Sequence, residues 1–465
     1  MNGNLYALLA ARFPQDRSRP LFEMLDGRAI SYGEAEAGAA RLAALLQARG
    51  VRPGDRVAVQ TPKSPEMVML YLAILKAGAA LLPLNTAYTE AEVDYFVRDA
   101  EPALVVTDAA ALAAEAAGLA PLEAVHEAAP DDLAAIVYTS GTTGRSKGAM
   151  LSHAALAANG LALTRAWGFT EADTLLHALP IYHVHGLFIA LHCVLLAGAK
   201  ALWLPKFDET QVLAAMARST VMMGVPTFYT RLLDDVRFTP QAARNIRLFI
   251  SGSAPLLPST FADFEARIGQ PILERYGMSE AAIITTNPLG GARLAGSVGY
   301  PLPGVDLRVA DDGIVQIKGP SVTGGYWRNP AKTAEAFTSD GYFITGDVGR
   351  QDPDGRLWLS GRASDLIISG GLNVYPKEIE LVLDEMAGVV ESAVIGLPHP
   401  DFGEAVAAVV VGEGDEAATI AAAREVLAAF KCPKRVFFVD DLPRNAMGKV
   451  LKAELRRRYA ETFGE

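Results

Sequence analysis

The sequence is poor in cysteine, with only Cys193 and Cys432 among its 465 residues. Two cysteines so far apart give no disulfide framework and no cysteine-based metal site, so we expect a reducing compartment. Long apolar runs are also missing. The longest, residues 186–199, contains His192 and ends at Lys200, which makes it too short to span a bilayer as a helix.

Positive charge is in deficit, since 42 lysines and arginines face 53 aspartates and glutamates, for a net charge of -11. That balance argues against a nucleic acid or a membrane surface as a partner held by bulk electrostatics. The N-terminus lacks a basic segment, and its short apolar stretch soon meets Arg12, so it does not resemble a secretory signal. We therefore expect a soluble, cytoplasmic protein that meets anionic ligands with local positive charge.

What the chain does have is length and apolar content, with 51% of its residues hydrophobic. Such a chain is expected to form at least two domains. Residues 1–108 alternate between strand and helix patterns, and residues 305–318 are typical of short antiparallel strands. The predicted fold class is α/β, with a large N-terminal domain of layered sheets and helices (residues 1–361) and a small mobile C-terminal α+β domain (residues 362–465).

A strand-like segment, residues 136–138, leads into a loop of glycine, serine and threonine that contains Lys147. Glycines let the backbone come close to a ligand. Successive N–H groups of such a turn can converge on an anion, and the lysine adds a point charge. The spacing does not fit the Gly-x-x-x-x-Gly-Lys-Ser/Thr P-loop, and an ordinary surface turn is the alternative. We predict a loop that binds a polyphosphate.

Two later stretches indicate the rest of a nucleotide site. In residues 275–280, Tyr276 can stack on a purine and Glu280 can hold Mg²⁺ near a phosphate. In residues 343–347, Asp347 is expected at a strand end, where it can accept hydrogen bonds from both ribose hydroxyls. The alternatives are a strand-end tyrosine, a surface acid and a turn aspartate, each without a role in binding.

Two more stretches lie toward the C-terminus. Residues 361–380 contain the pair Gly370 and Gly371, which permits flexibility and a close backbone approach. Residues 443–449 place Lys449 on a glycine-tipped loop, from which a mobile domain could deliver it to a site. The alternatives are an ordinary interdomain turn and a solvated lysine.

Taken together and in this order, these motifs resemble those of the adenylate-forming superfamily, which includes acyl-CoA synthetases, luciferases and peptide-synthetase adenylation domains. Four further segments are similar to the malonyl-CoA synthetases in particular: 177–188, 224–232, 251–256 and 293–299. The resemblance implies a two-step reaction. A carboxylate attacks the α-phosphate of ATP to give an acyl-adenylate and pyrophosphate, and the thiol of coenzyme A then displaces AMP.

The resemblance also implies the ligands and their residues. Malonate, ATP and coenzyme A would be bound as small molecules, with Mg²⁺ as the metal, and the oligomeric state stays open. Catalysis would fall to Lys449, Glu280 and His185, and the metal would be held by Thr142 and Glu280. The nucleotide would be bound by a larger set: Thr139, Ser140, Gly141, Thr142, Thr143, Gly144, Lys147, Ser253, Ala254, Pro255, Tyr276, Gly277, Met278, Ser279, Asp347, Arg362, Gly370 and Gly371.

The choice of acid needs a separate argument, because a dicarboxylate requires a cation for its far end. We assign this role to Arg293, with His185 and Ser253 as polar neighbours, since arginine suits bidentate capture of a carboxylate. The alternatives are an exposed loop arginine and a satisfied core histidine. At the level of function, the alternatives are methylmalonate or another short acid, a carrier protein as acceptor, and a catalytically silent sensor.

Overall fold

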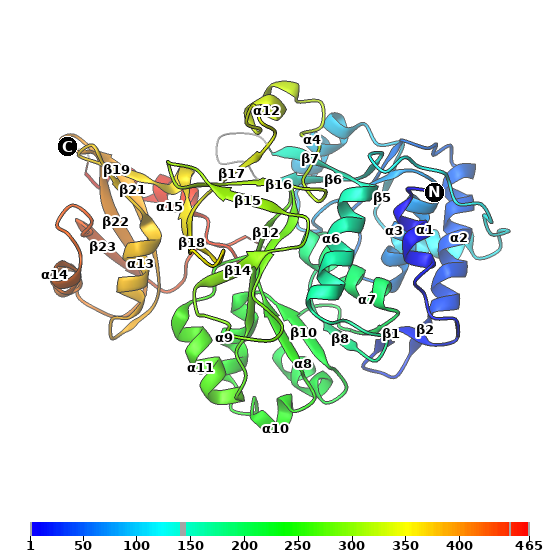
Figure 1. Cartoon of the computed structure of the whole chain (residues 1–465), viewed down its shortest axis with the longest axis horizontal. Helices are drawn as coiled ribbons and strands as arrows, with labels where there is room; N and C mark the ends of the chain where they lie inside the picture. The colour runs from blue at the N-terminus through cyan, green and yellow to red at the C-terminus, as the bar shows by residue number, and fades with distance from the viewer. Residues whose placement is uncertain (1, 140–145, 446–447, 464–465) are drawn as a thin grey trace.

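The computed structural model describes residues 2–139, 146–445 and 448–463. Residues 140–145 of the predicted phosphate loop therefore lie outside the described residues, and they include five assigned to the nucleotide: Ser140, Gly141, Thr142, Thr143 and Gly144. Within the described part of the chain, three sheets and their helices make up the molecule (Figure 1).

The first sheet forms from the N-terminal alternation of strands and helices, in the order β5-β3-β4-β6-β7. Its first four strands in this order pair in parallel, and β7 pairs antiparallel at the edge. The strands are β3 (Arg56–Val59), β4 (Ala80–Pro83), β5 (Leu104–Val106), β6 (Leu133–Thr139) and β7 (Lys147–Ser152). The helices of this part are α1 (Leu5–Ala10), α2 (Tyr32–Ala48), α3 (Pro65–Lys76), α4 (Glu90–Ala100) and α5 (Ala109–Ala116). The α/β pattern expected for residues 1–108 is confirmed.

Local sequence explains where helix α2 begins and ends. The Ser31 hydroxyl accepts from the Glu34 N–H, and the Glu34 carboxylate accepts from the Ser31 N–H at 2.8 Å, which is the expected capping box. The helix ends at Ala48, and Gly50 follows with a φ of +87°, a conformation that favours glycine.

A 13-stranded sheet forms the centre of the described molecule, and it changes character along its length (Figure 1). Neighbours from β12 to β1 pair in parallel, whereas neighbours from β12 to β15 pair antiparallel, and β2 pairs antiparallel with β1. In sheet order the strands are β15 (Asp306–Val309), β16 (Ile314–Lys318), β17 (Phe343–Gln351), β18 (Leu357–Arg362), β14 (Ser297–Pro301), β13 (Ala282–Thr286), β12 (Leu273–Met278), β11 (Leu248–Ser251), β10 (Val221–Gly224), β8 (Thr174–His177), β9 (Lys200–Trp203), β1 (Pro20–Met24) and β2 (Ala29–Ser31). The short antiparallel strands expected in residues 305–318 are thereby confirmed.

Helices connect and cover these strands, and one of them is a π-helix. They are α6 (His153–Ala166), the π-helix η1 (His185–Ala190), α7 (Leu191–Ala197), α8 (Glu209–Met216), α9 (Pro226–Asp234), α10 (Pro240–Ala243), α11 (Pro258–Ile268) and α12 (Pro330–Glu335). The apolar run at 186–199 therefore forms η1 and α7, which are buried. None of the described helices is long and apolar enough to cross a membrane.

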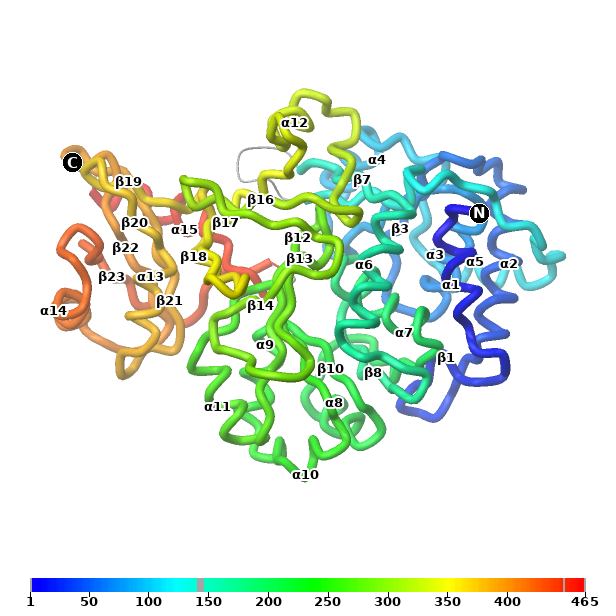
Figure 2. Tube along the Cα trace, viewed as in Figure 1, coloured from blue at the N-terminus to red at the C-terminus, as the bar shows by residue number. Residues whose placement is uncertain are grey.

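The third sheet belongs to a small unit at the end of the molecule opposite the N-terminus (Figure 2). Its strands are β19 (Ile367–Ser369), β20 (Leu372–Val374), β21 (Val389–His399), β22 (Gly403–Gly412) and β23 (Arg435–Val439). Its helices are the 3₁₀-helix η2 (Ala363–Asp365), α13 (Pro376–Asp384), α14 (Glu416–Val426) and α15 (Lys452–Arg458). The predicted fold class, a large α/β part and a small α+β part, is confirmed. The boundary at residues 361 and 362, near the end of β18, stays a prediction.

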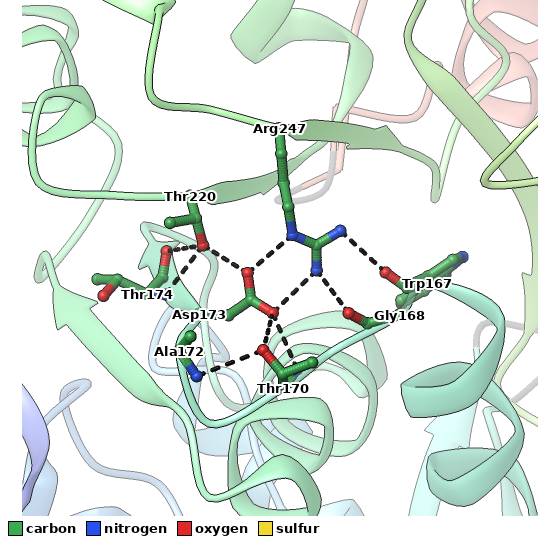
Figure 3. Close-up of polar contacts among 8 residues, drawn as sticks. All are labelled: Trp167, Gly168, Thr170, Ala172, Asp173, Thr174, Thr220 and Arg247. Atoms are coloured by element: carbon green, nitrogen blue, oxygen red, sulfur yellow. Dashed lines mark hydrogen bonds and ion pairs between the residues drawn. The ribbon is translucent and has the colours of Figure 1, made fainter.

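One edge of the parallel strands is closed by a network of polar contacts (Figure 3). Asp173, Thr220 and Arg247 each directly precede a strand, namely β8, β10 and β11. The Arg247 guanidinium donates to both carboxylate oxygens of Asp173, at 2.8 and 2.9 Å, and also to the carbonyls of Trp167 and Gly168. The Thr220 hydroxyl donates to Asp173 at 2.7 Å. This edge is held together by its own partners.

Candidate active site

The opposite edge of the same strands carries the segments singled out in the sequence. The strands β8, β10 and β11 end at His177, Gly224 and Ser251, and β12 ends at Met278. Because these strands are parallel, their carboxyl ends meet at one edge, where α/β folds bind ligands. Ser253, Ala254 and Pro255 follow β11, Gly277 and Met278 end β12, and Ser279 and Glu280 form the turn into β13.

Asp347 is the centre of one charged cluster. Arg362 Nε lies 2.6 Å from Asp347 Oδ1, and the Tyr276 hydroxyl donates to Asp347 Oδ2 at 2.5 Å. Burial raises the pKa of the Asp347 carboxyl, and the Arg362 charge opposes that shift. The expectation of a strand-end aspartate is wrong. Asp347 lies inside β17, where Gly346 with a φ of +72° and a register shift against β16 interrupt regular pairing.

Glu280 is the centre of a second cluster, on the side of the predicted phosphate loop. Its Oε1 accepts hydrogen bonds from the Tyr326 hydroxyl at 3.2 Å and from the Thr139 hydroxyl at 3.4 Å. Lys147 Nζ lies 5.2 Å from the centre of the Tyr326 ring. Burial raises the pKa of Glu280. Thr139 and Lys147, which border the undescribed loop, therefore both lie near the acid predicted to hold the metal.

These oxygens suit a hard cation such as Mg²⁺, which needs only one or two carboxylates when a ligand's phosphates and water supply the rest. No group of three or more histidine, cysteine, aspartate or glutamate side chains that could hold a metal is found in residues 2–139, 146–445 and 448–463. The donor set around Glu280 therefore fits a magnesium ion shared with a polyphosphate and does not fit an all-protein metal cage.

Lys449 reaches the first cluster from the small unit. Its charge interacts with those of Arg362, Asp347 and Asp365, and burial lowers its pKa. The loop is fixed by a hydrogen bond from the Lys449 N–H to the Asn445 side chain at 3.0 Å. Gly448, with a φ of +76°, packs so closely that a Cβ there would stand 3.3 Å from the Thr227 side chain of α9. In this arrangement the small unit brings Lys449 close to Asp347 and Arg362.

Gly370 and Gly371 occupy a different place. They form the tip of the hairpin between β19 and β20, with φ values of +59° and +79°. The Gly370 N–H donates to the Phe402 carbonyl, so the hairpin belongs to the small sheet. Nothing described lies within 4 Å of the point where a Gly371 Cβ would stand. Their assignment to the nucleotide stays a prediction.

The third feature of this edge is a buried arginine for which no role was predicted from the sequence. Arg275 is only 5% exposed, and its Nε and Nη2 have no hydrogen-bond partner among the described residues. Its guanidinium fills the space beside Gly252, where a Cβ would stand 2.4 Å from Arg275 Cζ. Burial lowers its pKa to about 9. A charged residue inside an otherwise buried strand was the available signal, because such a residue is rarely buried unless it has a partner.

His185 and Ser253 lie beside this arginine. The Ser253 hydroxyl and His185 Nδ1 are 3.1 Å apart, and His185 Nε2 has no partner in the described part of the chain. Burial, and then the Arg275 charge, lowers the pKa of His185 well below its ordinary value. Ser253 has a φ of +75°, a strained conformation for a residue with a side chain. The three side chains of His185, Ser253 and Arg275 are together called the acid pocket below, after the role predicted for His185 and Ser253.

Arg293 differs from Arg275, because its N–H groups already have hydrogen-bond acceptors in the protein. Its guanidinium donates to three backbone carbonyls, those of Pro271 at 2.8 Å, Leu289 at 2.8 Å and Pro288 at 3.2 Å. These bonds use one N–H group on each of the three nitrogens, and through them the side chain secures the loop after β13. The structure does not support the hypothesis that Arg293 is free to meet a second carboxylate.

Comparisons with known proteins agree with this geometry. Residues 9–327 match the family described as AMP-binding enzyme, and residues 378–449 match the AMP-binding enzyme C-terminal domain. A malonate–CoA ligase of Arabidopsis thaliana is 35% identical over 93% of this chain and 85% of its own length. A sulfoacetate–CoA ligase of Cupriavidus necator is 36% identical over 97% of both chains.

Solved structures of MatB from Rhodopseudomonas palustris are 51% identical and cover 100% of both chains. The ATP-bound form superposes with a TM-score of 0.96, and the apo form with 0.84. The identity is the same in both cases, so the structure of this chain is more similar to the ATP-bound form than to the apo form. Matched over most of its length by both parts of the family, the chain belongs to the AMP-binding enzymes and is a CoA ligase.

Proposed function

We propose that this protein joins malonate to coenzyme A at the expense of ATP, through a malonyl-adenylate, and releases AMP and pyrophosphate. The observation that carries the choice of acid is Arg275. A buried guanidinium with unpaired N–H groups costs free energy in the free protein, and a second carboxylate would satisfy it bidentately. His185 and Ser253 add polar contacts on the same side.

The first half-reaction needs cations more than it needs a base. A malonate carboxylate, ionised at neutral pH, attacks the α-phosphorus of ATP, and the bond from that phosphorus to the bridging oxygen breaks as pyrophosphate leaves. Lys449 would lie between the two anions, where its charge lowers the barrier most. Asp347 and Arg362 would hold the ribose, with Tyr276 fixing the Asp347 carboxylate.

Lys147, Thr139 and the predicted loop would bind the β- and γ-phosphates of ATP. The adenine would lie beside Ser253, Ala254 and Pro255. Glu280 would hold Mg²⁺, with Tyr326 and Thr139 orienting its carboxylate. When bound, the metal would neutralise charge on the phosphates. Thr142 and the loop's other undescribed residues keep their assignments as predictions.

In the second half-reaction, Lys449 would move away from the reacting groups together with the small unit. The thiol sulfur of coenzyme A attacks the acyl carbon, the bond to the AMP oxygen breaks, and AMP departs with that electron pair. We propose that the small unit turns about η2, where Ser364 is the small residue able to absorb a backbone change. The higher likeness to ATP-bound than to apo MatB supports an arrangement suited to the first step.

A second candidate acid is sulfoacetate, because one relative is named for it and its sulfonate is also an anion at the far end. Both acids, and methylmalonate, would use Arg275 in the same way. An acid without a second charge would leave the guanidinium unpaired.

A panel of acids with ATP, Mg²⁺ and coenzyme A separates these possibilities. Malonate, methylmalonate, sulfoacetate, propionate and ferulate are compared by initial rates of AMP and thioester formation. We expect malonate to give the highest kcat/KM, with pyrophosphate as the second product. Release of ADP and phosphate would contradict the adenylate route, and a preference for propionate or ferulate would contradict the role of Arg275.

A further inference from the structure

Lys63 is a half-buried lysine outside the reacting groups, and its contacts lead toward His185. Lys63 lies in the loop between β3 and α3, and its Nζ contacts three acceptors in the described structure. These are the His177 carbonyl at 2.8 Å, the Leu204 carbonyl at 2.7 Å and His177 Nδ1 at 2.9 Å. The ammonium group also lies 4.4 Å from the centre of the Trp203 ring. Lys63 thus ties the first sheet's loop to the carboxyl ends of β8 and β9.

The contact of the other ring nitrogen, His177 Nε2, shows which atoms donate in these hydrogen bonds. His177 Nε2 lies 3.0 Å from the Gly186 carbonyl, which can only accept, so Nε2 carries the proton. Nδ1 of the neutral ring is then an acceptor, and Lys63 must donate to it as well as to the two carbonyls. That uses all three N–H groups of an ammonium ion. Although burial lowers the Lys63 pKa, these acceptors and the Trp203 face favour its charged form.

Gly186 is the point where this network meets the acid pocket. Its carbonyl accepts the N–H of Leu191, five residues on, which is the bond that defines the π-helix η1. A side chain at Gly186 would stand 2.0 Å from the Pro180 carbonyl, so the backbone is packed closely here. The residue before it is His185. The His177 Nε2–H group therefore holds the first turn of the π-helix η1 by its hydrogen bond to the Gly186 carbonyl. His185 lies in that turn and contacts Ser253.

We propose that Lys63 is a positioning residue for the acid pocket: by donating to His177 Nδ1 it fixes the tautomer whose Nε2–H holds the Gly186 carbonyl, and thereby sets the place of His185. The idea rests on the proposed use of malonate at that pocket. Without Lys63 the ring could carry its proton on Nδ1 and turn an unprotonated nitrogen toward the carbonyl, which would release the first turn of η1.

The test variant is Lys63→Met, which keeps an unbranched side chain and loses the three donors. We expect its kcat/KM for malonate to fall by about 10-fold or more, since small misplacements of a binding group are costly. The KM for ATP should change less than about 2-fold, because the network does not touch the clusters around Asp347 and Glu280. The matched control is Lys76→Met. Lys76 is buried, donates to the Glu123 carbonyl and lies over the Tyr6 ring, away from His185.

A double-mutant cycle separates positioning from simple loss of stability. In a His185→Ala background, adding Lys63→Met should change the malonate-to-propionate preference little, because the side chain that Lys63 positions is already gone. Equal effects of Lys63→Met with and without His185, or the same loss of preference in Lys76→Met, would overturn the proposal.

A spectroscopic experiment tests the proposed tautomer directly and does not depend on which acid is the substrate. ¹⁵N-histidine NMR should show His177 as the Nε2–H tautomer, and Lys63→Met should shift that signal toward a mixture. An Nδ1–H signal for His177 in the wild type would overturn the proposal whichever acid is the substrate. If malonate is not turned over but His177 is the Nε2–H tautomer, the assignment of the acid is wrong and the proposed role of Lys63 toward His177 is retained.

Discussion

Arg247 and Arg275 belong to the same central sheet, yet they face opposite conditions. Arg247 precedes β11 and donates to the Asp173 carboxylate and to two carbonyls (Figure 3). Arg275 lies within the next strand, β12, and the structure as described gives its Nε and Nη2 no partner. The two side chains differ in what surrounds them, while their chemistry is the same.

The difference separates an edge built for stability from an edge built for a ligand. At the amino ends of the strands, the charges of Arg247 and Asp173 satisfy each other. At the carboxyl ends, the Arg275 guanidinium is buried without a partner for Nε and Nη2. These N–H groups are therefore available to a bound molecule. The predicted nucleotide site is intermediate, because Asp347 already has Arg362 and Tyr276 as partners and would exchange these contacts for others when a nucleotide binds.

The largest effect is expected where the small unit brings a charge to the ligand edge. Lys449→Ala should lower malonyl-AMP formation by on the order of 10²–10³-fold, because an electrostatic contact to the developing charge is lost. Conversion of supplied malonyl-AMP to malonyl-CoA should change by only a few-fold. Pyrophosphate exchange measures the first step and thioester formation the second. Equal losses in both steps would contradict this division of roles.

The comparison of the two arginines is tested directly by Arg275→Met. We expect kcat/KM for malonate to fall by about 10²-fold or more, because a buried anion would lose its partner. Propionate lacks the second charge, so its slow turnover should stay or improve. Parallel losses for both acids would show that Arg275 serves the fold.

Arg293→Ala is the matched control for that variant. Since Arg293 donates to three loop carbonyls, its loss should lower stability and leave the malonate-to-propionate preference within about 2-fold. The preference is measured as the ratio of the two kcat/KM values. A selective loss of malonate turnover in Arg293→Ala would restore the original assignment.

At the other edge, Arg247→Ala should cost about 2–3 kcal/mol of unfolding free energy, because Asp173 is left buried while Arg247 itself is partly exposed. The preference for malonate should not change. Burial alone would raise the pKa of Asp173, but hydrogen bonds from Arg247 and Thr220 outweigh it and lower the pKa. The stabilisation is therefore present above the ordinary aspartate pKa and is lost as the pH falls. Urea unfolding at neutral and acidic pH should show a smaller acid loss in the variant.

The smallest effect concerns the strained serine of the acid pocket. Ser253→Gly should stabilise the fold by about 1 kcal/mol, since glycine adopts a φ of +75° freely, while malonate kcat/KM falls by about 5-fold for the lost hydroxyl. Ser253→Ala keeps the strain and loses the hydroxyl, so it should show the kinetic loss alone. Thermal unfolding and initial rates check both variants. A Ser253→Gly enzyme with unchanged malonate kinetics would remove Ser253 from the acid pocket.

Several residues that the sequence predicted to bind the nucleotide lie close together in the structure, because they stand in short motifs with local meaning. Asp347, Arg362 and Lys449, predicted from separate motifs, do lie together, and Glu280 lies beside Thr139. Tyr326 was missed, since its contact with Glu280 spans 46 positions. Lys63 was missed for the same reason, since 114 positions separate it from His177.

The sequence by itself determined the helix caps, the strand–helix alternation and the order of the motifs, all of which depend on neighbours within a few residues. From the sequence alone the second carboxylate was assigned to Arg293, and Arg275 was given no role, although both are arginines in segments that resemble the same family. Only the tertiary structure decided which guanidinium reaches carbonyl acceptors and which is buried without them. The free energy of a buried charge depends on partners brought from distant parts of the chain, and a list of residues does not contain that information.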